Sequence, residues 1–300
     1  MDDREDVCVL IPTLNEAETI GDVIDGFASH GFENVLIIDG NSTDGTADIA
    51  RERGARVIEQ SGSGKGQAVR EGIRHVEADY VLMLDGDGTY RPEDADAILE
   101  PIVDGEYEHV IGNRFADMAD GAMSRLNRVG NAMFNWVFRH VHGENFEDIL
   151  SGYRAFTRES VENFYLDADG FGVETELAVE CVKHDVPTTV VPIRYEARPD
   201  DSETNLHPLQ DGGVILVTLY QLAKTNNPLF YFGSMGVLSS LFGFALGAYV
   251  GIEWVTRRVG HEVLAVVAAF AILFGVQLLM FGVLSDLIVT LHREQMRRLE

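Results

Sequence analysis

Two long apolar segments near the C-terminus restrict this chain more than any other feature of its sequence. Residues 229–252 and 263–285 contain no charged side chain. A helix rises about 1.5 Å per residue, so roughly 20 apolar residues cross the hydrocarbon core of a bilayer. The sequence therefore predicts a transmembrane helical hairpin. We place its spans at residues 228–252 and 262–291, followed by a cytosolic tail at residues 292–300.

Glycines recur along one face of the first apolar segment. Gly243, Gly247 and Gly251 lie four residues apart, so they share one face of a helix. Small residues at this spacing let membrane helices approach closely, although glycine is also common in membrane helices in general. We expect this glycine face to pack against another helix and to offer a contact for a homo-oligomer.

The part of the chain before residue 228 has the composition of a soluble acidic domain. It begins with an acidic stretch and has no secretory signal peptide, so we expect it to stay in the cytosol. The net charge is −26, from 49 acidic and 23 basic residues, and lysine occurs only at Lys65, Lys183 and Lys224. This balance disfavours nucleic acid as a partner and is typical of proteins whose self-repulsion is screened by concentrated salt. Cys8 and Cys181 lie far apart, which indicates neither a disulfide nor a zinc site.

Apolar strands alternate with amphipathic helices over the first hundred residues. We expect strands at 7–11, 35–38, 56–58 and 80–84, and helices at 16–27, 46–53, 67–75 and after Pro92. Strands that are apolar on both faces are typical of a parallel sheet covered by helices on either side. The fold class is therefore α/β, with a doubly wound, mostly parallel sheet. In such sheets ligands bind beyond the carboxyl ends of the strands.

The remainder of the soluble part is less regular. We expect a strand at 110–113, helices at 123–141 and 174–184, and a final strand at 189–195. An apolar-faced helix then precedes the first span, and we assign residues 207–227 to an amphipathic helix on the membrane surface. The soluble α/β domain accordingly covers residues 1–206.

The strongest chemical signal is an Asp-x-Asp sequence that follows the fourth strand. Asp85 and Asp87 lie one residue apart on the loop where this strand ends. Hard cations such as Mg²⁺ or Mn²⁺ prefer carboxylate oxygens together with substrate phosphates. A metal held in this way neutralises the charge that develops on a departing diphosphate. An Asp-x-Asp sequence by itself is commonplace in so acidic a chain, so its neighbours decide its meaning.

Four further motifs accompany the Asp-x-Asp sequence. They are Ile11-Pro-Thr-Leu-Asn-Glu16, Asp39-Gly-Asn-Ser-Thr-Asp-Gly-Thr46, Gly64-Lys-Gly66 and Ser151-Gly-Tyr-Arg154. In this order the five motifs resemble the large inverting glycosyltransferase family 2, which includes the dolichyl-phosphate mannose and glucose synthases. The resemblance covers about residues 5 to 206 and implies the nucleotide-diphospho-sugar transferase (GT-A) fold. Within the family the chain looks most like haloarchaeal enzymes that load the first hexose of an N-linked glycan onto dolichyl phosphate.

The resemblance implies an enzyme and a set of residue roles. The reaction would transfer a hexose from a nucleotide-diphospho-sugar, of UDP-glucose or GDP-mannose type, to dolichyl or polyprenyl phosphate with inversion. The enzyme would sit in the cell membrane with its catalytic domain facing the cytosol. The implied nucleotide-sugar site consists of Pro12, Asn15, Glu16, Asp39, Lys65 and Asp85. The metal, Mg²⁺ or Mn²⁺, would be held by Asp85 and Asp87. The acceptor phosphate would be bound by Arg114, Arg128 and Arg198. The catalytic residues would be Asp87, Arg114 and Arg128.

Such a reaction needs no strong general base. A phosphate monoester has a second pKa of about 6 and is already largely ionised at neutral pH. We therefore expect Glu174 and Glu176 to position other groups instead of abstracting a proton. For Asn15 a second interpretation stays open, in which it merely caps a helix that starts at Glu16. Each arginine has a second interpretation too, as the partner of a surface carboxylate.

Three positions depart from the family's pattern. Thr89 stands where many members carry a glutamine that helps to bind the metal, which leaves the third metal ligand open. Residues 203–206 replace a Ser-Lys-Leu sequence after Arg198, and Gly40 replaces a frequent second aspartate. These departures leave the base and the sugar of the donor undetermined.

Two other functions are compatible with these motifs. A glycan-extending membrane glycosyltransferase with a hydroxyl acceptor shares the fold but carries a Gln-x-x-Arg-Trp motif, and neither Trp136 nor Trp254 follows an arginine. An inactive nucleotide-sugar-binding membrane scaffold is the other alternative. The intact Asp85 and Asp87 argue against it.

Overall fold

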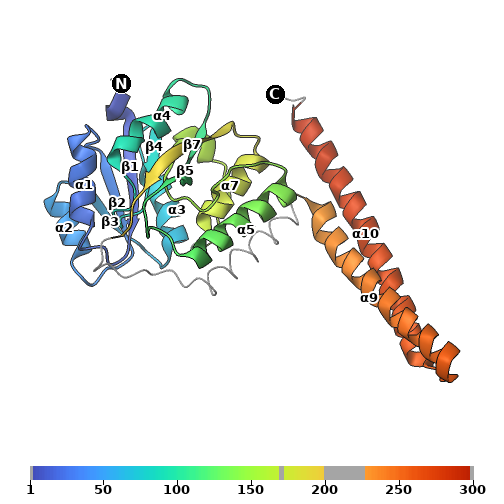
Figure 1. The fold of residues 1–300 in the computed structure, drawn as a ribbon. Helices are drawn as coiled ribbons and strands as arrows, with labels where there is room; N and C mark the ends of the chain where they lie inside the picture. The colour runs from blue at the N-terminus through green and yellow to red at the C-terminus, as the bar shows by residue number, and fades with distance from the viewer. Residues whose placement is uncertain (1–2, 169–171, 199–226, 298–300) are drawn as a thin grey trace. The chain divides into compact units, whose positions relative to one another are not determined.

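The computed structural model describes residues 3–168, 172–198 and 227–297. The chain divides into two compact units, Met1–Thr218 and Leu219–Glu300. The first contains an α/β domain and the second a pair of long helices, as Figure 1 shows.

Within the described residues, the strands of the first unit form one seven-stranded sheet in the order β3-β2-β1-β4-β6-β5-β7. The strands are β1 (Val7–Thr13), β2 (Val35–Asp39), β3 (Arg56–Glu59), β4 (Tyr80–Met83), β5 (His109–Met118), β6 (Arg154–Thr157) and β7 (Thr188–Tyr195). Only β6 runs antiparallel, against β4 on one side and β5 on the other. The predicted mostly parallel α/β sheet is confirmed, whereas β6 was not expected from the sequence to be a strand.

Helices cover both faces of the sheet (Figure 1). They are α1 (Ile20–Ser29), α2 (Thr46–Glu52), α3 (Lys65–His75), α4 (Ala95–Val103), α5 (Arg125–His142), α6 (Arg158–Val161) and α7 (Val173–Lys183), and a short 3₁₀ turn, η2 (Pro92–Asp94), precedes α4. Alternate residues of β1 serve the two cores: Val9 packs with α1 and α4, and Leu10 packs with α3 and α7. Because the strand is buried on both faces, its residues before Thr13 are apolar on both sides instead of alternating with polar ones.

Two predicted boundaries near the N-terminus differ from the structure. Pro12 lies inside β1 and pairs with Ile38, instead of ending the strand. Pairing of β1 with β4 stops at Leu10, so β1 tolerates a residue that has no N–H to donate on that side. The first helix begins at Ile20 and not at Glu16.

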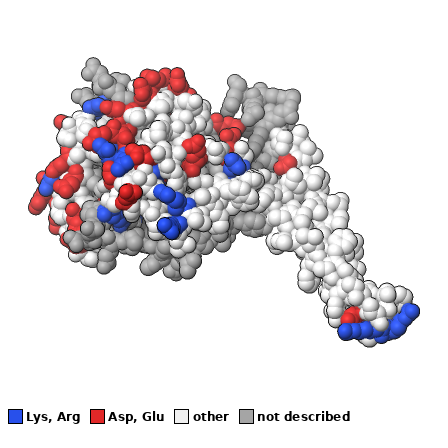
Figure 2. Space-filling view, viewed as in Figure 1, with Lys and Arg blue, Asp and Glu red and all other residues white. Residues whose placement is uncertain are grey.

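The second unit is a helical hairpin of α9 (Pro228–Arg257) and α10 (Glu262–Arg297). Both helices are long and apolar enough to cross a membrane. On the face shown in Figure 2 the hairpin is uncharged over most of its length, and charged atoms gather at the turn between the helices, where Glu253 and Arg257 form an ion pair. The predicted membrane-surface helix at residues 207–227 lies, apart from Asn227, outside the described residues.

The two long helices pack through small residues, of which only Gly243 belongs to the glycine face predicted from the sequence. A Cβ atom at Gly243 would lie 2.7 Å from the carbonyl oxygen of Ala268, and one at Gly275 would lie 2.5 Å from that of Gly236. Ser239 Oγ also donates a 2.8 Å hydrogen bond to the carbonyl of Ala271 across the hairpin. The close helix–helix approach therefore depends on the absence of side chains at these glycines.

The other two glycines of the predicted face play no such part. A Cβ atom at Gly247 would only touch Ala268 at 3.9 Å, and one at Gly251 would meet nothing within 4 Å. The expected packing face is thus confirmed at Gly243, whereas Gly247 comes only within ordinary contact distance of α10 and Gly251 meets nothing within 4 Å.

We expect Gly275→Leu to destabilise the hairpin, because the new side chain would overlap the backbone of Gly236. Overpacking of this kind costs about 1–3 kcal/mol. Thermal unfolding of the detergent-solubilised protein is the measurement, with Gly251→Leu as the matched control that should leave the midpoint unchanged. Equal midpoints for both variants would show that the helices do not approach each other at Gly275.

Candidate active site

Three neighbouring strands bring the polar motifs to one edge of the sheet. β2, β1 and β4 lie side by side and parallel, so the residues that follow their carboxyl ends converge. Asp39 is the last residue of β2 and is almost fully buried. Its carboxylate accepts hydrogen bonds from Thr13 Oγ1 at 3.3 Å and from the backbone N–H of Ser42 at 2.9 Å. The predicted nucleotide-site residue is therefore held rigidly at the strand end.

Asn15 links the first motif to the second. It adopts a left-handed backbone conformation, with φ of 57°, which asparagine tolerates better than most residues. Its side-chain oxygen accepts a 2.9 Å hydrogen bond from the N–H of Thr43, and its own N–H donates to Ser42 Oγ at 2.9 Å. The alternative in which Asn15 caps a helix starting at Glu16 is wrong, since the helix starts four residues later.

Both oxygens of Asp87 are engaged. Oδ1 accepts hydrogen bonds from the N–H and the hydroxyl of Thr89, at 3.1 and 2.6 Å. Oδ2 accepts from Nε and Nη2 of Arg198, at 3.0 and 2.7 Å. Thr89, which left the third metal ligand open in the sequence, thus orients the carboxylate of Asp87. Arg198, assigned from the sequence to the acceptor phosphate, lies next to this aspartate.

Lys65 forms ion pairs with two carboxylates. Its ammonium group contacts Asp85 and lies 2.5 Å from Glu174 Oε1. Burial alone lowers the pKa of Lys65, but the two carboxylates outweigh burial and hold this pKa above its ordinary value. Glu174 was missed as a binding-site residue by sequence reasoning, which treated it only as a positioning group. No local signal pairs the first turn of α7 with the first residue of α3.

Glu16 adds a third acidic group to this region. The pKa of Glu16 is raised to about 7, chiefly by burial, while the carboxylates of Asp87 and Asp85 add to the rise and Arg198 opposes it. Because both aspartates act on this pKa, the three acidic side chains share one electrostatic environment. The Ile11–Glu16 motif and the Asp-x-Asp sequence are therefore parts of one site.

The oxygen atoms at this site fit a divalent cation. Asp85 and Asp87 offer hard carboxylate oxygens, and each already faces a positively charged side chain, which stands where a cation would be. Among the described residues, no three His, Cys, Asp or Glu side chains form a ready-made metal cluster. A cation here would accordingly need further oxygens, such as those of a diphosphate.

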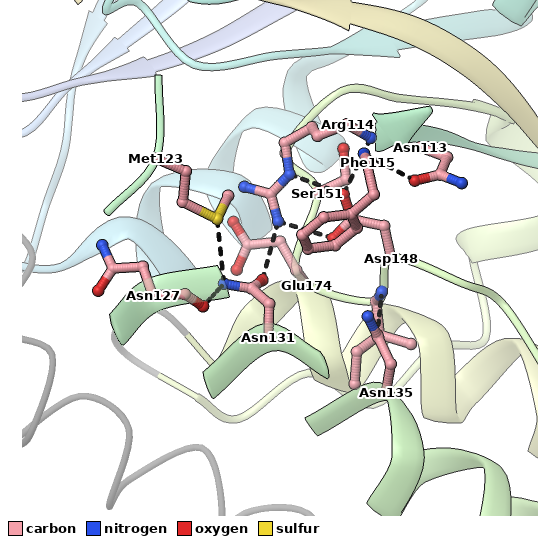
Figure 3. A network of polar contacts seen from close by, with 12 residues as sticks. Asn113, Arg114, Phe115, Met123, Asn127, Asn131, Asn135, Asp148, Ser151 and Glu174 are labelled. Carbon is pink, nitrogen blue, oxygen red and sulfur yellow. Dashed lines mark hydrogen bonds and ion pairs between the residues drawn. The ribbon is translucent and has the colours of Figure 1, made fainter. Parts of the chain in front are cut away.

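Arg114 is the centre of a buried network. β5 loses its regular pairing with β7 between Asn113 and Asp117, and irregularities of this kind redirect a side chain. Nε and Nη2 of Arg114 donate to the two oxygens of Asp148, both at 2.7 Å, and Nη2 also donates to Asn131 of α5 at 3.1 Å (Figure 3). Asp148 was not singled out from the sequence.

Tyr195 connects this network to the carboxylates. The guanidinium of Arg114 lies 5.5 Å from the centre of the Tyr195 ring. Burial raises the pKa of Tyr195, Arg114 lowers it, and the charges of Asp87 and Asp85 raise it again. Arg114, Asp85 and Asp87 therefore all act on the pKa of the same tyrosine.

The Ser-Gly-Tyr-Arg motif supports the site from beneath. A Cβ atom at Gly152 would lie 2.6 Å from Asp85 Oδ2, so only glycine fits there. The N–H of Gly152 donates to the hydroxyl of Tyr90 at 3.0 Å. Arg154 is fully buried and donates to the carbonyls of Ser151 and Ile149. This motif therefore shapes the floor of the site.

Arg128 and Glu176 lie in different surroundings. Arg128 is exposed on α5, and its Nη2 lies 3.1 Å from the sulfur of Met118. Glu176 is buried in the first turn of α7, and its Oε2 accepts hydrogen bonds from the N–H groups of Asp167 and Ala168 at 3.0 and 2.9 Å. Burial raises the pKa of Glu176, and these hydrogen bonds oppose the rise. The three arginines of the predicted acceptor site therefore have three different environments.

Residues 8–164 match the family model described as Glycosyl transferase family 2. The glycosyltransferase AglJ of Haloferax volcanii is 63% identical, over 98% of this chain and 97% of its own. The chain belongs to glycosyltransferase family 2. A dolichyl-phosphate hexose transferase of the same organism is 34% identical, over 70% of this chain and 91% of its own.

Solved structures agree with the predicted fold. Glucosyl-3-phosphoglycerate synthase from Mycobacterium tuberculosis, solved with Mn²⁺ and UDP-glucose, superimposes with a TM-score of 0.59 at 22% identity, over 72% of this chain and 78% of its own. The GT-A fold expected from the resemblance is thus confirmed, as is the similarity to haloarchaeal family members. The protein is a glycosyltransferase.

Proposed function

We propose that this glycosyltransferase moves a hexose from a nucleotide-diphospho-sugar to dolichyl or polyprenyl phosphate and inverts the anomeric centre. Its product would be a lipid-linked sugar for protein N-glycosylation. Support for the acceptor comes from the relative named as a dolichyl-phosphate hexose transferase. The two helices long enough to cross a membrane would keep the enzyme at the acceptor, as a multi-pass protein with its catalytic domain in the cytosol.

The donor would bind at the carboxyl ends of β2, β1 and β4. Asp39 and Asp85 would accept hydrogen bonds from the nucleoside, with Pro12, Asn15 and Glu16 lining the same edge. Mg²⁺ or Mn²⁺, held by Asp85 and Asp87, would neutralise charge on the departing diphosphate. Lys65 would add a positive charge close to that diphosphate, because Glu174 and Asp85 hold its ammonium group at the site.

The observation that supports a lipid acceptor is the exposed apolar surface of α5. Leu126, Val129, Met133 and Trp136 follow one another at helical spacing and are exposed, between 43% and 68% of their full surface. α5 contains no acidic residue, although the whole chain has 49. An apolar stripe on an acid-free, arginine-bearing helix is typical of a surface that lies against lipid headgroups. Arg128 belongs to this helix, which would bring it near the phosphate of a membrane-embedded acceptor.

The side chains of this protein would allow the sugar transfer without a general base. A phosphate monoester is largely dianionic at neutral pH and attacks without losing a proton to the enzyme. Arg114, Arg128 and Arg198 would compensate its charge, and the planar guanidinium suits phosphate oxygens. Glu176 would act as a positioning residue, because its carboxylate already accepts two backbone N–H groups.

A transfer assay tests the proposal. The full chain in detergent and concentrated KCl would be mixed with dolichyl phosphate and a panel of labelled nucleotide-sugars, and the lipid phase extracted. We expect one labelled sugar to enter the lipid phase. Arg128→Ala should raise the KM for the acceptor several-fold and lower kcat, while Glu176→Gln should lose activity only modestly across pH 6 to 9.

The reverse pattern would overturn the proposal. If Glu176→Gln abolishes turnover while Arg128→Ala is near normal, the acceptor is a hydroxyl that needs a general base. The glycan-extending alternative would then be correct. No incorporation from any donor, with intact nucleotide-sugar binding, would favour the scaffold.

A further inference from the structure

The ion pair between Arg198 and Asp87 lies where the proposed metal site requires a carboxylate. The two residues are separated by 111 positions in the chain, and both Nε and Nη2 of Arg198 donate to the same oxygen, Oδ2. Oδ1 of Asp87 is committed to the hydroxyl and N–H of Thr89. A cation that approaches Asp87 must therefore take Oδ2 in place of the guanidinium.

The buried ion pair between Arg114 and Asp148 differs in kind from the Arg198–Asp87 pair. Arg114 grips both oxygens of Asp148, and their side chains are 10% and 0% exposed. Arg198 uses one oxygen of Asp87, and its side chain is 29% exposed. The Arg114–Asp148 pair is deeply buried, and both carboxylate oxygens of Asp148 are occupied. The guanidinium of Arg198 is partly exposed and can turn toward solvent, but Asp87 is only 6% exposed and then needs another cation in its place. Of these two pairs, the Arg198–Asp87 pair is the one suited to an exchange of its cation.

We propose that Arg198 is an internal counter-ion of Asp87 that a divalent metal displaces, and that the freed guanidinium then serves the acceptor phosphate. Arg198 and the metal compete for Oδ2, so a bound metal excludes the ion pair. Asp87 faces a cation both before and after this exchange, so its carboxylate is never left without a positive partner. The acceptor-binding part rests on the proposed function, whereas the competition for Asp87 does not.

Thermodynamic linkage couples the binding of metal and donor to the binding of the acceptor phosphate. If metal and donor release Arg198, they increase the affinity for an acceptor phosphate, and the acceptor must increase the affinity for metal and donor by the same factor. The enzyme would then bind its acceptor well only after it is loaded with donor. This order protects the donor site from a lipid phosphate, which carries the same kind of charge as the diphosphate.

Mn²⁺ binding tests the competition directly. Isothermal titration of the full chain in detergent and concentrated KCl, with UDP or GDP present to supply diphosphate oxygens, would give the Kd for Mn²⁺. Arg198→Gln removes the competing charge and should tighten the Kd about fivefold, on the scale of a partly exposed ion pair. Arg198→Lys, which keeps the charge, should remain close to the wild type.

Two further variants serve as controls. Arg194→Gln removes a nearby arginine that pairs with Asp117 and Glu196, and should leave Mn²⁺ binding unchanged. Asp87→Asn should abolish it. An unchanged or weaker Kd in Arg198→Gln, with the same thermal midpoint as the wild type, would overturn the proposal. If Arg198→Gln fails to fold, Arg198→Met removes the same charge, and a Kd no tighter than that of the wild type in this variant would also overturn the proposal.

Acceptor binding separates this inference from the proposed function. Binding of dolichyl phosphate in mixed micelles would be measured with and without Mn²⁺ plus UDP or GDP. The wild type should bind the lipid several-fold more tightly with one of these mixtures, and Arg198→Gln should lose the increase. If Mn²⁺ affinity rises in Arg198→Gln but no mixture promotes lipid binding, the counter-ion role stands and the lipid-phosphate acceptor is wrong. If Mn²⁺ affinity does not rise, the counter-ion role is wrong and the proposed function stands.

Discussion

Asp87→Asn is expected to lower turnover at least about 100-fold, because it removes one of the two carboxylates placed to hold a divalent cation. The substitution keeps the size of the side chain, and the amide oxygen can still accept the hydrogen bonds from Thr89. What it loses is the negative charge that now faces Arg198. The effect should therefore fall on the chemical step and on metal binding, and much less on the fold.

Transfer of labelled sugar into the lipid phase is the measurement, at saturating donor and over a range of Mn²⁺ concentrations. Asp48→Asn is the matched control, since the Asp48 side chain is 83% exposed and pairs only loosely with Arg51 on the surface of α2. The control should keep wild-type turnover. Full product formation by Asp87→Asn, or by the wild type in excess chelator, would refute metal-assisted transfer at this site.

Asp148→Ala is expected to destabilise the protein by about 3–5 kcal/mol, the typical cost of leaving a buried charge without its partner. Asp148 is fully buried and holds the guanidinium of Arg114 with both oxygens, and it also accepts from the N–H of residue 114. Burial alone lowers the pKa of Arg114, and Asp148 holds it well above its ordinary value. Without Asp148 the guanidinium, which stays protonated, would have to move to solvent or draw water into the core.

Thermal unfolding of the full chain in concentrated KCl measures this loss. Asp79→Ala breaks an ion pair with Arg158 in which Asp79 is 73% exposed and the closest atoms are 3.8 Å apart, so it should change stability by less than about 0.5 kcal/mol. Equal unfolding midpoints for the two variants would show that Arg114 does not depend on Asp148. Retained stability with lost acceptor binding would instead assign Asp148 a purely functional role.

Much of the donor side was predictable from the sequence. Apolar strands and helices alternate regularly along the first hundred residues. Parallel strands place their carboxyl ends at the same edge of the sheet. Asp39, Lys65, Asp85 and Asp87 follow such strands or begin the next helix, so their convergence follows from local pattern and topology. The same reasoning located both membrane-capable helices, because apolar composition over a sufficient length is visible without any tertiary contact.

Contacts between distant segments were not predictable. β6 is a strand of four residues whose polar and glycine neighbours conceal it, and it forms because it fits between β4 and β5. The pairing of Glu174 with Lys65 joins the start of α7 to the start of α3. The glycine spacing of α9 suggested a packing face, but only the crossing with α10 decides which glycines are enclosed.

The family, the fold class, the membrane-capable hairpin and the acidic residues of the proposed donor site are predictable from the sequence. These follow from periodicity, length and short motifs, which are properties of neighbouring residues. Tertiary structure alone decided the partners of the charged groups: Asp148 for Arg114, Glu174 for Lys65 and Arg198 for Asp87. Any of the many carboxylates in so acidic a chain can pair with an arginine at the surface. Only burial, which makes an unpaired charge costly, selects one partner for each.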